Sequence, residues 1–212
     1  MSARIANCPN CGARIEFRWS SAVQTTCKFC RSILVRHDVD LTKVGEVADL
    51  PPDSSPIQIA TEGIYRNKPF VVVGRILYEY EKGGWNEWNM VFSDGVSGWL
   101  SDTQEEYAVS FPATPPQPLP APENVERGQK ALWNGVRYVV TCLTRARFRG
   151  VEGELPFEYW DKEERLFVDL RSADGRCATI DYSHAEPLLF LGEAAEFDDL
   201  HLKNLRQFEG WS

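Results

Sequence analysis

The sequence predicts a mainly β protein in which a small N-terminal module precedes two tandem small β-barrels, SH3-like and related by internal duplication. Three observations support this prediction. Two Cys-x2-Cys pairs occur within the first 30 residues, short alternating apolar runs bounded by turn residues fill much of the remaining chain, and part of that pattern recurs after a proline-rich segment. Alternation with a period of two is typical of strands, and Gly, Asn and Asp between such runs are typical of hairpins.

Residues 1–45 have the pattern of a zinc ribbon. Cys8 and Cys11 form one pair, Cys27 and Cys30 form the other, and fifteen residues separate the pairs. This is the spacing of a four-cysteine zinc site, in which two tight turns bring four sulfurs about 2.3 Å from one ion. We expect one structural zinc ion, because so short a segment buries too little core to fold alone. Docking or nucleic-acid binding by basic residues of this segment remains an alternative role, and redox chemistry a weaker one.

Residues 57–111 are expected to form the first barrel. Breaker residues over 50–56 end the N-terminal module, and apolar alternation then resumes. Asp94-Gly95 is a strong hairpin signal, because glycine accepts the positive φ of a tight turn. A linker over 112–124 follows and holds six of the chain's 13 prolines, so it is expected to be extended. Five strands are expected in this barrel, over 57–65, 69–80, 87–93, 97–101 and 107–111.

Residues 125–205 are expected to form the second barrel. Phe70 corresponds to Tyr138 at an offset of 68, whereas the Asp94-Gly95 turn corresponds to Asp174-Gly175 at an offset of 80. About twelve residues are therefore inserted in the second copy, within 147–162. We interpret this stretch as a long acidic hairpin insertion, because long loops on a rigid scaffold often carry binding contacts.

The first Asp-Gly hairpin carries the candidate binding residues. Trp85, Glu87 and Trp88 precede the turn and Trp99 follows it, and the second copy lacks the last two tryptophans. Alternate strand residues face opposite sides of a sheet, so the tryptophans divide between two faces unless a bulge intervenes. Either one or two of them pack in a core, or at least one is exposed as an anchor for a partner.

No catalytic arrangement is evident in the sequence, and we expect no enzyme activity. His37, His184 and His201 are the chain's three histidines, and His184 lies in a polar cluster that favours a turn over a nucleophile and base. Cys142 and Cys177 lie in apolar runs and are expected to be small core residues.

Composition narrows the class of protein further. The formal net charge of -8 argues against general nucleic-acid binding, which depends on neutralising phosphates. No apolar run is long enough to span a bilayer, and the first residues lack the apolar core of a signal peptide. We therefore expect a cytoplasmic protein with reduced cysteines.

A set of motifs in the first barrel matches the pattern of a known family. These motifs are Gly63, Phe70-Val71-Val72-Val73-Gly74-Arg75-Ile76, Trp85-Asn86-Glu87-Trp88, Asp94-Gly95 and Gly98-Trp99-Leu100. Through them, residues 57–111 resemble a bacterial family known as domain of unknown function 4178, and 126–192 resemble it as a second copy that departs at both tryptophans. The resemblance implies a β-rich unit, often behind a zinc ribbon, in the company of phage-shock type membrane-stress proteins and polyamine synthase-like enzymes. It implies no catalytic residues.

These observations lead to two main hypotheses about function. The first is a non-enzymatic interaction or scaffold protein, acting as a protein-binding adaptor in a membrane-stress assembly of the phage-shock type. The second is a binding protein for a small cation such as a polyamine. Nucleic-acid binding through the zinc ribbon is a third and weaker alternative. The acidic residues that would attract a cation are Glu79, Glu81, Glu87, Asp94, Asp102, Glu105 and Glu106.

Overall fold

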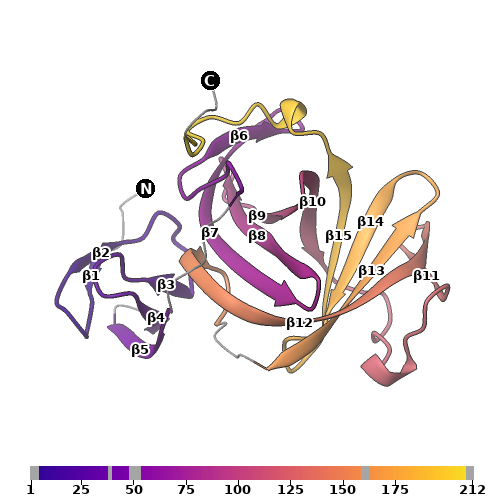
Figure 1. Ribbon diagram of the computed structural model, residues 1–212, viewed down its shortest axis with the longest axis horizontal. Coiled ribbons are helices and arrows are strands. Elements are labelled where there is room, and N and C mark those ends of the chain that lie inside the picture. Colours follow the sequence, from indigo (N-terminus) through magenta and orange to yellow (C-terminus); the bar gives the residue numbers. More distant parts are fainter. Residues whose placement is uncertain (1–4, 38–39, 48–53, 159–162, 209–212) are drawn as a thin grey trace.

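The computed structural model describes residues 5–37, 40–47, 54–158 and 163–208, which form mainly antiparallel β-sheet (Figure 1). Strands hold 58% of the described residues and helices 3%, which confirms the predicted mainly β class. The described residues contain two short 3-10 helices, η1 (Pro122–Asn124) and η2 (Asp198–Leu200). No helix in the described parts of the chain has the length and apolar character to cross a membrane. The strands are β1 (Ile5–Asn7), β2 (Arg14–Glu16), β3 (Gln24–Thr26), β4 (Ser32–His37), β5 (Asp40–Glu46), β6 (Glu62–Tyr65), β7 (Lys68–Tyr80), β8 (Gly83–Phe92), β9 (Ser97–Thr103), β10 (Glu106–Ala113), β11 (Lys130–Trp133), β12 (Val136–Leu155), β13 (Glu164–Ser172), β14 (Arg176–Asp181) and β15 (Leu188–Ala195).

One closed barrel dominates the fold. Its antiparallel strands follow the order β7-β8-β9-β10-β15-β14-β13-β12, and β12 returns to pair with β7. The first half of the chain supplies β7 to β10 and the second half supplies β12 to β15. Two seams join the halves: β10 pairs with β15 from Tyr107↔Ala195 to Ala113↔Leu189, and β7 pairs with β12 from Glu79↔Arg147 to Gly74↔Gly153.

This arrangement corrects the prediction of two tandem SH3-like barrels over 57–111 and 125–205. Both seams cross between the halves, so neither half closes on itself. An open sheet leaves unpaired backbone groups along its two edges, and here each half pairs its edges with those of the other. The halves do share the order of their strands. Their Asp-Gly turns also match, with Gly95 at φ +85° and Gly175 at φ +84°.

The barrel strands are buried on both faces. One set of alternate residues faces the interior, where Ile76, Tyr78, Trp99, Phe148 and Phe167 form a cluster. The other set faces outward into two separate cores. The core of the first half contains Phe70, Trp88, Met90, Leu100 and Leu200, and the core of the second contains Trp133, Tyr138, Val168, Leu170 and Ile180.

The predicted acidic hairpin insertion is wrong for residues 147–155, which form the second half of β12. Residues 147–153 pair with β7 and close the barrel, and Glu154 and Leu155 pair with β3 (Figure 1). Two glycines permit the close approach of β12 and β7. A Cβ on Gly74 would lie 1.9 Å from the Glu154 carbonyl oxygen, and Gly153 has φ +66°. Residues 159–162 of the predicted insertion lie outside the described residues.

The N-terminal strands β1 to β5 form what we call the four-cysteine module, residues 5–47. Its small core contains Cys8, Phe17, Trp19, Cys27 and Leu34. The order β5-β4-β3-β12 continues the barrel sheet into this module. The module and the barrel therefore share strand β12.

The close crossing at Gly153 leads to a testable difference between two glycines. We expect Gly153→Ala to lower the free energy of unfolding by at least about 2 kcal/mol more than Gly175→Ala. Both residues have positive φ, but a Cβ at Gly153 would lie 2.1 Å from the Val73 carbonyl oxygen, whereas a Cβ at Gly175 meets nothing within 4 Å. Urea unfolding of the two variants measures this. Equal losses would show that β12 does not need this approach.

Candidate functional site

Four cysteine sulfurs converge in the N-terminal module. The Sγ atoms of Cys8 and Cys30 lie 3.6 Å apart, those of Cys11 and Cys27 lie 3.7 Å apart, and all four lie within 4.8 Å of one another. Sulfurs placed tetrahedrally 2.3 Å from one ion are about 3.8 Å apart. A disulfide would require about 2.05 Å. The donor set and its spacing therefore fit a metal ion.

Each cysteine pair is held by a tight backbone turn. The amide of Gly12 donates to the carbonyl of Cys8 at 2.8 Å, and the amide of Arg31 donates to the carbonyl of Cys27 at 2.9 Å. Ser32 Oγ lies 3.2 Å from Cys30 Sγ. This contact is the main cause that lowers the pKa of the Cys30 thiol to about 5, and a thiolate is the form that binds metal.

A cavity of about 340 Å³ lies inside the barrel, which is the size of a small-ligand site. Strands from both halves supply its walls, because residues of all eight barrel strands point toward the same space. Four carboxyl side chains line it, from Glu87, Glu106, Asp169 and Asp181. The aromatic residues that line it are Tyr78, Tyr80, Trp85, Trp99, Phe157, Phe167 and Phe190.

The aromatic walls are packed against one another across the barrel. Trp85 stacks on Tyr78 with ring centroids 4.8 Å apart, and Phe167 from the opposite half meets Trp85 edge-on at 5.4 Å. Phe157 stacks on Trp99 at 5.7 Å. These contacts fix the positions of the rings, so the cavity has a preformed aromatic lining.

Three of the cavity carboxyls have raised pKa values. Burial is the main cause that raises the pKa of Glu87 to about 8, and the charges of Asp169 and Asp181 raise it further, although hydrogen bonds from Ser101 and Trp85 oppose the shift. Burial also raises the pKa of Asp169 and of Asp181.

Neutral donors contact these three carboxyls. Trp85 Nε1 donates to Glu87 at 3.1 Å, Thr179 Oγ1 donates to Asp169 at 2.9 Å, and the amide of Ser183 donates to Asp181 at 2.7 Å. Within the described residues, none of the three carboxyls forms an ion pair with a lysine or arginine; His184 lies 3.9 Å from Asp181. Arg171 also lines the cavity, and its charge opposes the raised pKa of Asp169, but it forms no ion pair with these three carboxyls.

The structure divides the four predicted binding residues of the first hairpin. Trp85, Glu87 and Trp99 line the cavity, whereas Trp88 is fully buried in the outer core of the first half. The guanidinium of Arg75 lies over the Trp88 ring at 4.9 Å. Trp99 is only 4% exposed, so neither it nor Trp88 is a surface anchor for a protein partner.

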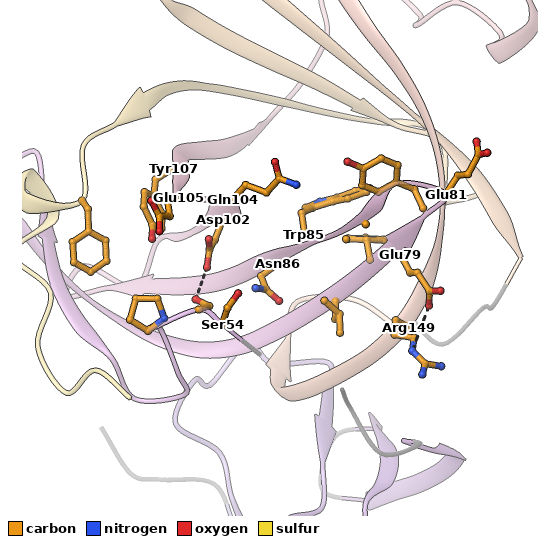
Figure 2. Close-up of a pocket in the computed structure, with 18 of the residues that line it drawn as sticks. Ser54, Glu79, Glu81, Trp85, Asn86, Asp102, Gln104, Glu105, Tyr107 and Arg149 are labelled. Atoms are coloured by element: carbon orange, nitrogen blue, oxygen red, sulfur yellow. Dashed lines mark hydrogen bonds and ion pairs between the residues drawn. The ribbon is translucent and has the colours of Figure 1, made fainter. Parts of the chain in front are cut away.

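The acidic residues predicted to attract a cation do not form one site. Glu87 and Glu106 line the cavity, and Asp94 pairs with Lys68 at 2.6 Å elsewhere. The other four line an outer pocket of about 1290 Å³ (Figure 2), in which Asp102 accepts a hydrogen bond from Ser55. These four are Glu79, Glu81, Asp102 and Glu105.

The outer pocket and the cavity adjoin. Tyr78, Tyr80 and Trp85 line both of them, and Figure 2 shows Trp85 and Glu81 on the same side of the outer pocket. The carboxylate of Glu79 already forms ion pairs, with Arg147 at 3.1 Å and with Arg149 at 3.4 Å. The sequence did not single out several cavity residues, among them Asp169, Asp181, Tyr78, Tyr80 and the aromatic residues of the second half.

Comparison with known proteins yields one match. A family model described as domain of unknown function (DUF4178) matches residues 58–197 as a single span, which covers both halves of the barrel and leaves out the four-cysteine module. Searches of curated proteins and of solved structures find no significant match.

The raised pKa of Glu87 predicts a pH-dependent penalty on folding. Since the pKa rises from about 4.3 in the unfolded chain to about 8 in the folded chain, the folded state holds this proton more tightly. The free energy of unfolding of the natural protein should therefore fall relative to Glu87→Gln as the pH rises from about 5 to about 8. Urea unfolding of both proteins across this range measures the difference. A difference that stays constant with pH would contradict the assignment.

Proposed function

The chain belongs to the DUF4178 family, and from this premise we propose that its barrel binds a small organic cation, such as an amine, in the central cavity. The observation that carries the proposal is a set of carboxyls inside an aromatic-lined cavity: Glu87, Asp169 and Asp181 form no ion pair with a lysine or arginine among the described residues, although Arg171 also lines the cavity. The family description assigns no activity, so the support comes from the cavity itself.

A bound ammonium group would interact favourably with both the carboxyls and the aromatic side chains of the cavity. A buried carboxylate is costly without a partner of opposite charge, and a cation in the cavity supplies that partner. The aromatic side chains that line the cavity attract the same charge through their ring electrons. The volume of about 340 Å³ limits the ligand to a small molecule. Polyamines are one class of such cations.

The outer pocket supports entry of a cation from solvent. Glu81 and Glu105 are exposed at this pocket, and it adjoins the cavity at Trp85. Acidic side chains around a pocket raise the local concentration of cations and speed their association. The formal net charge of -8 acts in the same direction.

We place ligand binding ahead of the protein-adaptor hypothesis, because the hairpin tryptophans that supported an adaptor line the cavity or lie in a core. We also favour binding over catalysis. Burial raises the pKa of the cavity residue Cys177, so it stays a poorly nucleophilic thiol.

Two further proposals concern the rest of the chain. Within the four-cysteine module we infer a zinc ribbon that holds one zinc ion, since four thiolates in tetrahedral spacing suit zinc and require a reducing compartment such as the cytoplasm. We infer that the halves arose by duplication, since β6 to β10 and β11 to β15 repeat the same order of strands.

Calorimetric titration with spermidine and with smaller amines tests the cavity proposal. Binding requires ionised Glu87, so the affinity should rise by up to about tenfold per pH unit between pH 6 and pH 8 and then level off. Glu87→Gln should abolish most of this rise. Glu126→Gln is the matched control, because Glu126 is exposed and lines neither the outer pocket nor the cavity; it should change the affinity at pH 8 by less than about threefold, since a distant exposed carboxylate contributes little. Failure of every amine to bind, or an equal loss in both variants, would refute the proposal.

A further inference from the structure

We propose that the four-cysteine module stabilises the wall of the cavity, with Glu154 as the positioning residue that attaches the module to β12, the strand that closes the barrel. The contacts of Glu154 and Leu155 with the module are called the clasp. Metal release would then loosen that wall and expose the cavity. The inference rests on the proposed function only in treating the cavity as a ligand site, and the closing experiment separates the two.

Strand β12 physically links the cavity wall to the module. Residues 147–153 pair with β7 in the wall, and the next two residues, Glu154 and Leu155, pair with Thr25 and Gln24 of β3. The carbonyl of Leu155 also accepts a hydrogen bond from the amide of Val23 at 2.9 Å. Strand β3 ends at Thr26, directly before Cys27. Backbone pairing therefore connects the strand of the wall to the strand that leads directly into Cys27.

Glu154 is the side chain that ties the two parts together. It is only 4% exposed, and its two carboxylate oxygens accept hydrogen bonds from the amides of Arg18 at 2.7 Å and Trp19 at 2.8 Å. Burial raises the pKa of Glu154, while these two amide bonds favour its charged form. A buried carboxylate needs such donors, so the position of the Arg18–Trp19 backbone matters to the end of β12.

The metal site determines whether that backbone stays in place. Trp19 packs in the same small core as Cys8 and Cys27. So small a core does not fold alone, and binding energy at a structural metal site is folding energy. Loss of the metal would therefore free the Arg18 and Trp19 amides from Glu154. It would also free β3 from its pairing with Leu155.

Loosening of the clasp would alter the cavity, because a residue that lines the cavity follows the clasp directly in the sequence. Phe157, two residues beyond Leu155, lines the cavity and stacks on Trp99. Ile33 of the module and Leu155 share the interior cluster with Tyr78. The clasp thus holds both an aromatic wall residue and the strand beside it.

Hydrogen exchange of the full chain tests the clasp without any ligand. We expect removal of the metal by a chelator to speed amide exchange by at least about tenfold in residues 147–155 and 74–79, as well as in the module, while β14 and β15 stay protected. Acceleration confined to residues 5–47 would overturn the proposal.

Glu154→Gln separates the clasp from the metal. This variant loses one acceptor oxygen and should speed exchange in residues 147–155 while still holding about one zinc per chain. Glu16→Gln is the matched control, because Glu16 pairs with Arg14 at the module surface, and it should leave exchange there unchanged. If Glu154→Gln fails to fold, the chelator experiment on the natural chain decides alone. Amine binding with no response at 147–155 would refute the clasp and leave the proposed function standing, whereas the converse result would refute only the function.

Discussion

The pairing of β12 with β7 is the interaction on which the rest of the structure depends. It joins the second half of the chain to the first along one seam, while β10 and β15 form the other. Closure leaves no open edge at either seam, and it also encloses the interior-facing residues of both halves in one space. The cavity and its carboxyls exist only because the two halves face each other across a single barrel.

That geometry explains the electrostatics of the site. Closure shields Glu87 of the first half from solvent, which is the main cause of its raised pKa, and brings it near Asp169 and Asp181 of the second half, whose charges raise the pKa further. Two carboxyl groups near each other in a poorly solvated space hold their protons more tightly. The barrel therefore encloses carboxyls whose ionisation near neutral pH lowers its own stability.

Local signals predicted the local structure well, and they could not predict how the halves meet. The Asp94-Gly95 turn, the alternation around it and the spacing of the four cysteines each depend on neighbouring residues, and the structure shows the corresponding hairpin and sulfur cluster. The seams depend on contacts between distant segments, for which a single sequence carries no local pattern. Similar halves suggested separate barrels for this reason.

The same limit applied to residues 147–155. Glycines and acidic residues there indicated a loop, whereas in the structure Glu152 pairs with Arg75 at 3.0 Å and Gly153 allows the strand to cross β7. Alternation divided the hairpin tryptophans between two faces, but the residues of the second half that face Glu87 and Trp99 became visible only in the closed barrel.

The most direct test of a cation site in the cavity is the pKa of Glu87, measured by NMR of a carboxyl-labelled glutamate with and without a bound amine. The account predicts a pKa of about 8 in the free protein that falls by at least about one unit when the cation binds, since an adjacent positive charge favours the carboxylate. An ordinary pKa in the free protein, or a raised pKa that a bound amine leaves unchanged, would contradict it.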